Sequence, residues 1–254
     1  MILRADLPLL EFDDAQTAQL NPEHLVDRPF STDKLIITFF PEVMEQLRGH
    51  KAIELEREIP GENPLLVYRF TDHPEILITL GFVGCPACGS NLDLLNAMGI
   101  NKVMFCGGGG VLDPDFEPGQ LLLVDGAIRD EGFSHHYLAP SRYVHSETAV
   151  TDRIAAYLDA QQIACRRGLT WTTDAIFRET PDKVAQRRQE GAQIVEMEQA
   201  GCIAVAQFRH FSYGAIIYGG DDVSQTEWAD RGWRSLAGIR YDLVMLCQQL
   251  VQLI

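Results

Sequence analysis

The chain has 254 residues, of which 46% are apolar, and this is enough to build one α/β domain with a full core. Its formal net charge of −15 argues against a nucleic acid or an anionic membrane as partner, because the long-range field repels both. No apolar run is long enough to cross a bilayer, and the N-terminus does not resemble a signal peptide. We therefore expect a cytoplasmic protein with a single domain, residues 1–254, that acts on a small ligand. Residues 1–33 would form an N-terminal extension at a subunit interface.

Short β-branched or leucine-rich runs recur along the chain and predict buried strands. They cover residues 34–39, 65–68, 76–80, 102–105, 120–124, 168–172 and 213–218. Between several of them the apolar spacing changes to that of a helix, at positions 150, 154 and 158, at 197, 200, 204 and 208, and at 243, 246, 247 and 250. Strands that alternate with helices predict a largely parallel sheet that helices cover on both faces.

Six cysteines occur, and two of them form the C-x-x-C stretch Cys85 to Cys88. No second Cys or His pair stands at the spacing of a zinc finger, and the surroundings are not those of a thioredoxin-like motif. We expect reduced thiols that pack as small apolar side chains, and no metal.

Four glycines, Gly107 to Gly110, follow the predicted strand at 102–105. Without side chains they let a ligand approach the backbone and expose several N–H donors. This suits an anion or a sugar hydroxyl, and the pattern is neither a dinucleotide fingerprint nor a Walker loop. A tight turn between crowded backbones explains the glycines equally well.

An aromatic side chain and an arginine, Phe177 and Arg178, follow the predicted strand at 168–172. Together they can stack on a planar base and hydrogen-bond its edge. The alternative is an ordinary packed loop with a surface ion pair.

Two acidic residues flank a methionine in Glu196-Met197-Glu198. A carboxylate can accept hydrogen bonds from a vicinal diol, and a methionine can pack beneath a sugar ring. Alternatively, the pair is an acidic first helical turn that complements the helix dipole.

Asp221 and Asp222 follow the last predicted strand. A carboxylic acid at the end of a sheet can protonate a leaving group when a confined setting raises its pKa. The alternative is a Gly-Asp turn in which Asp222 caps the next segment.

Taken in order, these segments resemble the superfamily of uridine and purine nucleoside phosphorylases and the related nucleosidases. The likeness extends over residues 34 to 250 and rests on segments 107–110, 117–124, 127–132, 136–140, 172–177, 195–198 and 220–222. It implies a three-layer α/β/α fold with a central mixed, largely parallel, twisted sheet. It also implies a homo-oligomer built from dimers, such as a hexamer.

The resemblance assigns roles to individual residues. Glu196, Met197 and Glu198 would bind the ribose, with Glu198 gripping its hydroxyls. Asp222 matches the acid that protonates or hydrogen-bonds the departing base in purine-acting members, which favours a purine. The base pocket would be formed by Thr173, Asp174, Ile176, Phe177 and Arg178.

The sequence departs from the superfamily pattern at the positions that bind phosphate. Phosphorylases of the superfamily bind phosphate through a Gly-Asp-Pro-x-Arg turn after the first strand and through an arginine and a Ser or Thr in the glycine turn. Here the matching stretches, 38–44 and 105–109, contain no cation. Phosphate would then rest on Gly107, Gly108 and Gly109, with Arg129 as a substitute cation; Arg178, or Arg28 or Arg57 from a neighbouring subunit, are the alternatives.

We therefore predict a nucleoside phosphorylase, a pentosyltransferase of nucleoside salvage that cleaves a purine nucleoside with phosphate to give the free base and ribose 1-phosphate. It would need no cofactor, since phosphate is a co-substrate. The predicted catalytic residues are Asp222, Glu198 and Glu42. Two alternatives stay open: a nucleosidase in which Glu42 activates water, and a nucleoside-binding protein without catalysis.

Overall fold

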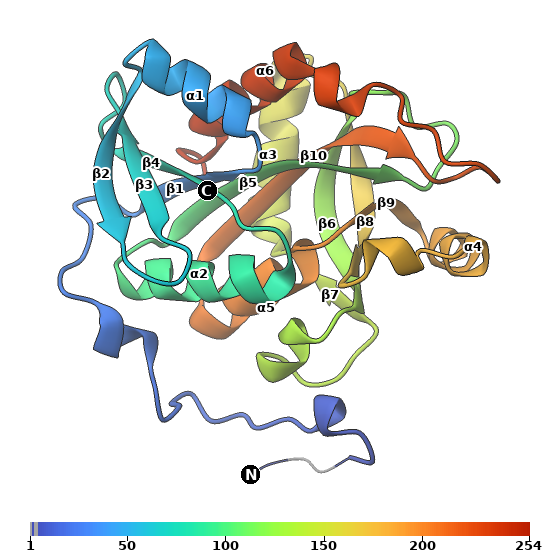
Figure 1. Ribbon diagram of the computed structural model, residues 1–254, viewed down its shortest axis with the longest axis horizontal. Helices are drawn as coiled ribbons and strands as arrows, with labels where there is room; N and C mark the ends of the chain where they lie inside the picture. Colours follow the sequence, from blue (N-terminus) through green and yellow to red (C-terminus); the bar gives the residue numbers. More distant parts are fainter. Residues whose placement is uncertain (1, 3–4) are drawn as a thin grey trace.

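A computed structural model describes residue 2 and residues 5–254 and shows a β-sheet with helices on either side (Figure 1). The strands in this part of the chain are β1 (Lys34–Thr38), β2 (Ile53–Ile59), β3 (Leu65–Phe70), β4 (Ile76–Leu80), β5 (Lys102–Val111), β6 (Leu121–Asp130), β7 (Tyr143–His145), β8 (Cys165–Thr173), β9 (Ala192–Glu196) and β10 (Ser212–Asp222). The α-helices are α1 (Pro41–Gly49), α2 (Cys85–Ala97), α3 (Thr148–Ala160), α4 (Pro181–Gln189), α5 (Gln199–Arg209) and α6 (Ala237–Leu250). Short 3-10 turns are η1 (Pro8–Leu10), η2 (Pro22–Leu25), η3 (Phe133–His136), η4 (Ile176–Arg178) and η5 (Trp233–Ser235).

The sheet closes on part of itself. Its strand order is β10-β6-β8-β9-β5-β1-β4-β3-β2, with β7 beside β6, and β10 also pairs with β5. Strands β5, β10, β6, β8 and β9 therefore form a barrel-like ring, from which β1, β4, β3 and β2 extend. The ring forms because β5 changes neighbours along its length: residues 102–106 pair with β1, and Gly110 and Val111 pair with β9.

The prediction of a mixed sheet is confirmed, but the sheet is not largely parallel. Of the ten strand pairings found in the described residues, five are parallel and five are antiparallel. The ring also differs from the single open layer that a three-layer fold implies. Apolar spacing reports that a strand is buried, but it carries no information on strand direction or on closure.

Two large apolar cores lie against the sheet. The first packs α2 and α5 on the sheet and includes Leu92 and Ile203. The second packs α1, α3 and α6 and includes Met44, Ile154 and Val244. Figure 1 shows these two groups of helices on opposite sides of the strands. Each fully buried aliphatic side chain contributes about 1.5–3 kcal/mol, so these cores hold the strand ends in fixed positions.

The N-terminal extension, described here from residue 5 to residue 33, runs along the outside of the body (Figure 1). It contains η1 and η2, and it leaves Leu7, Leu20 and Leu25 at least 60% exposed. Among the described residues, no helix has both the length and the apolar character that a membrane crossing requires.

Candidate active site

The junction between β9 and α5 holds the predicted ribose-binding residues. Glu196 is 6% exposed, and its carboxylate accepts four hydrogen bonds. The donors are the hydroxyls of Thr170 (3.0 Å) and Thr172 (2.5 Å) and the backbone N–H groups of Glu198 (2.6 Å) and Gln199 (2.7 Å). Two of these donors are backbone N–H groups of the turn that carries Glu198, so Glu196 holds that turn in place. Direct contact of Glu196 with ribose stays a prediction.

Glu198 is the ligand-facing candidate of this pair. It is 6% exposed, and its Oε1 accepts a hydrogen bond from the backbone N–H of Gly84 at 2.7 Å. Burial raises the pKa of Glu198, and the nearby charge of Glu196 raises it further. Burial also raises the pKa of Glu196, to about 7, but the four donors around it oppose this rise, so the proton of this carboxyl pair resides on Glu198. Met197, half-buried, lies between the two acids in the chain.

The four glycines are part of β5 and not a turn after it, because the strand extends to Val111. A Cβ on Gly108 would lie 2.7 Å from the ring of Tyr218, and one on Gly109 would lie 2.5 Å from the carbonyl oxygen of Val195. Close packing thus explains the glycines on the protein side. Gly108 is nevertheless exposed, so its backbone remains accessible to a ligand. Phosphate binding by Gly107, Gly108 and Gly109 stays a prediction.

Two phenylalanine rings lie against each other, one from each of the two stretches, 38–44 and 105–109, that contain no cation. The ring centroids of Phe39, after β1, and Phe105, in β5, are 4.9 Å apart. The Phe39 ring also fills the space beside Gly81, where a Cβ would collide with it. Apolar rings therefore occupy this part of the site, and they offer no hydrogen bond to an anion.

Glu42 lies in the first turn of α1 and forms an ion pair with Arg240 of α6, with 2.8 Å between Oε1 and Nη1. Arg240 is 7% exposed, and its Nε–H donates to the hydroxyl of Tyr218 at 2.8 Å. Its guanidinium carbon lies 5.1 Å from the ring centroid of Phe40, 5.7 Å from that of Tyr218 and 5.3 Å from that of Trp233. Sequence reasoning did not find Arg240. Its signal was an arginine one turn before Leu243 and Val244, on the buried face of a helix.

The two aspartates at the end of β10 face different partners. Asp222 accepts a hydrogen bond from the backbone N–H of Ser224 at 2.8 Å and lies 3.5 Å from Arg231 Nη1, so it organises its own loop. Asp221 accepts from the indole N–H of Trp228 at 2.7 Å, and its other oxygen lies 3.7 Å from where Gly110 would carry a Cβ. Asp221 is therefore the aspartate beside the glycines. The acid role of Asp222 stays a prediction.

The predicted base-binding residues divide into two groups. Thr173 is buried, and Asp174 accepts a hydrogen bond from the backbone N–H of Gly132 at 2.9 Å, so both hold loops together. Ile176, Phe177 and Arg178 are exposed, and Phe177 reaches 94%. The contact of these residues with a base stays a prediction.

Sequence reasoning also missed Glu179, which directly follows the predicted base-binding residues. Burial and the charge of Asp221 raise its pKa to about 7, from an ordinary value of 4.5. Glu179 and Asp221 thus form a second acidic pair. A carboxyl group near its pKa at neutral pH is suited to proton transfer.

Arg129 is fully engaged inside the protein. Its five N–H donors contact Ser134 Oγ (2.8 Å), Leu138 O (3.1 Å), Ala139 O (2.8 Å), Ser141 Oγ (2.7 Å) and His135 Nδ1 (3.4 Å). It holds the loop around η3 closed. This geometry does not support Arg129 as the substitute phosphate cation.

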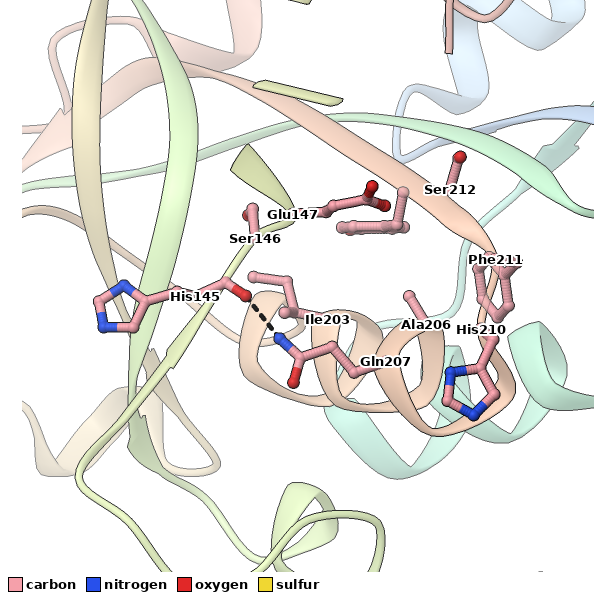
Figure 2. A pocket seen from close by; sticks show the side chains of 10 residues that line it. His145, Ser146, Glu147, Ile203, Ala206, Gln207, His210, Phe211 and Ser212 are labelled. Atoms are coloured by element: carbon pink, nitrogen blue, oxygen red, sulfur yellow. Dashed lines mark hydrogen bonds between the residues drawn. The ribbon is translucent and has the colours of Figure 1, made fainter. Parts of the chain in front are cut away.

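Two hollows lie away from these residues. One of about 560 Å³ lies between β7 and the C-terminal half of α5, where Gln207 donates a hydrogen bond to the carbonyl of His145 (Figure 2). The other, of about 790 Å³, is lined by residues that include Thr32 and Arg69. Neither contains a predicted site residue. No group of three or more His, Cys, Asp or Glu side chains in the described part of the chain could hold a metal ion, and Cys85 and Cys88 are buried free thiols.

Comparison with known protein families identifies the family of this chain. A model of the phosphorylase superfamily matches residues 33–236. The chain belongs to the phosphorylase superfamily. The matched region includes the candidate site from Phe39 to Trp233, but Arg240 lies beyond it.

This superfamily member is 27% identical to a guanosine phosphorylase of Halorubrum lacusprofundi over 146 residues, which span 57% of this chain and 60% of that relative. An uncharacterised protein of Acanthamoeba polyphaga mimivirus is 22% identical over 180 residues, 70% of each chain. The fold is similar to uridine phosphorylase from Vibrio fischeri, with a TM-score of 0.71, 16% identity and coverage of 93% of this chain and 98% of that one. It is equally similar to purine nucleoside phosphorylase from Toxoplasma gondii in complex with immucillin-H, with a TM-score of 0.71, 16% identity and coverage of 92% and 96%.

Proposed function

We propose that this phosphorylase-superfamily protein cleaves the N-glycosidic bond of a purine nucleoside with phosphate, giving the free base and ribose 1-phosphate. The observation that carries the proposal is the buried Glu198 carboxyl, which Gly84 and the Glu196 turn hold in place. The similarity to a guanosine phosphorylase supports a purine substrate.

Cleavage of a nucleoside passes through an oxocarbenium-like transition state, so the enzyme must hold the sugar and stabilise the departing base. Glu198 would release its proton to solvent as the nucleoside binds, and its carboxylate would then accept hydrogen bonds from the ribose hydroxyls. On the other side, Asp221 or Asp222 would donate a proton or a hydrogen bond to the purine ring as the bond to C1′ breaks. Phosphate oxygen would then form the new bond at C1′.

A second reaction has its own support. Phe39 and Phe105 occupy the stretches where phosphorylases of the superfamily have their phosphate-binding cations. Glu42 has a side chain that is 39% exposed, so it can reach a water molecule and act as a general base. Water in place of phosphate would make the protein a nucleosidase.

One experiment separates the two reactions. The protein is incubated with a panel of purine and pyrimidine nucleosides, with and without inorganic phosphate, and free base and ribose 1-phosphate are measured. We expect release of a purine base that requires phosphate and yields ribose 1-phosphate. Equal release without phosphate would establish hydrolysis, and no release from any nucleoside would leave a binding protein.

A further inference from the structure

The proposed reaction lacks a cation for its phosphate. A phosphate dianion is bound tightly through charge-assisted hydrogen bonds, and the net charge of −15 makes a local cation more necessary. The stretches at 38–44 and 105–109 contain none, and the N–H groups of Arg129 all point into its own loop. A cation on another element would supply these hydrogen bonds.

Arg240 brings a positive charge to both cation-free stretches. It lies in the N-terminal turn of α6 and forms an ion pair with Glu42, a residue that follows β1. Through the hydroxyl of Tyr218 it reaches β5, because that hydroxyl would lie 3.0 Å from a Cβ on Gly108. The side chain thus lies beside the 38–44 stretch and, through Tyr218, beside the exposed Gly108, on the face of the sheet that carries Phe40 and Tyr218 and opposite to that of Phe39 and Phe105.

The surroundings of Arg240 hold it in a fixed orientation. Three aromatic rings lie within about 6 Å of the guanidinium carbon, which is a favourable arrangement for a cation. Its hydrogen bonds to Tyr218, Glu42 and the carbonyl of Trp233 use three of its five N–H groups. A planar guanidinium held in this way matches the oxygen spacing of a phosphate group.

Glu42 is the part of this arrangement that can leave. Arg240 has 8% side-chain exposure and Glu42 has 39%, so the carboxylate can turn to solvent while the arginine stays in place. A partly exposed ion pair contributes little stability, and a phosphate oxygen can take the position of the carboxylate oxygen.

We propose that Arg240 is the cation of an anion site beside Gly108, and that inorganic phosphate binds there by displacing the carboxylate of Glu42. The inference rests on the proposed function, because it names the group that binds the phosphate of that reaction. It also differs from the nucleosidase alternative, in which Arg240 would keep Glu42 in place as the base for water.

The test is direct titration of the protein with inorganic phosphate in a calorimeter, without nucleoside. We expect Arg240→Gln to weaken the Kd for phosphate at least tenfold, because charge-assisted hydrogen bonds are lost. We expect Glu42→Gln to tighten the Kd about threefold to tenfold, because the competing carboxylate is gone. The opposite directions make the pair of variants informative, and the second keeps the test valid if Arg240→Gln does not fold.

Arg209→Gln is the matched control. Arg209 also pairs with a carboxylate, Asp93, at 2.7 Å, and lies 4.9 Å from the ring centroid of Phe208, but at the far end of α5. The Kd of the Arg209→Gln protein for phosphate should remain within twofold of that of the unmodified protein. Arg240→Lys, which keeps the charge but loses the planar fork, should bind phosphate with an intermediate Kd.

The results distinguish this inference from the proposed function. Unchanged phosphate binding in Arg240→Gln, no tightening in Glu42→Gln, or no phosphate binding by the unmodified protein would overturn the anion site. Phosphate-dependent base release with an unchanged KM for phosphate in Arg240→Gln would overturn it too, while leaving the phosphorylase function intact. Phosphate binding that depends on Arg240, together with base release that ignores phosphate, would support the site and overturn phosphorolysis.

Discussion

The sugar side of the candidate site, Glu196 to Glu198, comes from one short segment, whereas its anion side joins Glu42 and Arg240, which are 198 positions apart. On the sugar side, the hydrogen-bonding capacity of the Glu196 carboxylate is satisfied within the protein, because threonine hydroxyls and backbone N–H groups surround it. The anion side depends on an ion pair with a half-exposed member. The part of the site that resembles the superfamily is therefore local in the chain and held by internal hydrogen bonds, whereas the part that departs from it is assembled by the tertiary fold.

The largest effect should come from the sugar side. Glu198→Ala should lower kcat/KM for the nucleoside that the protein cleaves by about 1000-fold, roughly 4 kcal/mol, because the ribose hydroxyls lose their acceptor in the transition state. Steady-state kinetics measure this, and thermal melting reports folding separately. Glu56→Ala, which removes a carboxylate paired with Arg69, serves as the control. A rate within tenfold of normal would exclude Glu198 from ribose binding.

Next in size is the contrast between the two aspartates. Asp221→Asn should lower turnover of a purine nucleoside by about 100-fold, because Asp221 lies beside the glycines and a general acid typically contributes that much. Asp222→Asn should instead lower the melting temperature, because it weakens the loop that Ser224 and Arg231 close. Measurements of kcat and melting temperature on both variants test the contrast. The reverse pattern would make Asp222 the acid.

The rigidity of the sugar side predicts an effect on stability. Glu196→Gln replaces an acceptor oxygen with an NH₂ group in front of N–H and O–H donors, which should cost about 2–3 kcal/mol. For a chain of this size the melting temperature should fall by about 4–12 °C. Calorimetry or urea unfolding measures this. An unchanged melting temperature would mean that these hydrogen bonds do not hold the turn.

The smallest effect concerns pH and the Glu179–Asp221 pair. The folded-state pKa of Glu179 is raised to about 7 from 4.5, so its contribution to stability is present below pH 4.5 and is lost as pH rises through 7. Between pH 5 and pH 8 the unmodified protein should therefore lose about 1–2 kcal/mol more than Glu179→Gln. Urea unfolding of both proteins at the two pH values gives the difference. Parallel losses would show that Glu179 does not titrate in this range.

Much of the fold could be predicted from residue spacing. All seven apolar runs coincide with strands, because a strand buried on both faces must be apolar throughout. Strands β2, β7 and β9 were not predicted; of these, β2 reads Ile-Glu-Leu-Glu-Arg-Glu-Ile and lies at the edge of the sheet, where charged side chains face solvent. Helices α1, α2 and α4 were not predicted; of these, α2 begins with Cys-Pro-Ala-Cys-Gly, which contains strong breakers of helical patterns.

The site was less predictable, and the reason is again distance along the chain. Glu198 could be identified because it stands in a short motif at the end of a strand. Arg240 does not stand in such a motif, because its contact with Glu42 exists only after α1 and α6 pack together. The choice between Asp221 and Asp222 depends on which way each side chain points, and an irregularity in the β5–β10 pairing between Gly219 and Asp222 changes that direction.

The glycines of β5 also limit how this protein can change over generations. A side chain at Gly108 would strike the ring of Tyr218, and one at Gly109 would strike the backbone of Val195. Any side chain at Gly108 therefore requires the Tyr218 ring to move, and any side chain at Gly109 requires a shift of β9 itself. A smaller residue at position 218 would relieve the first clash, whereas no side-chain substitution would relieve the contact with the Val195 carbonyl.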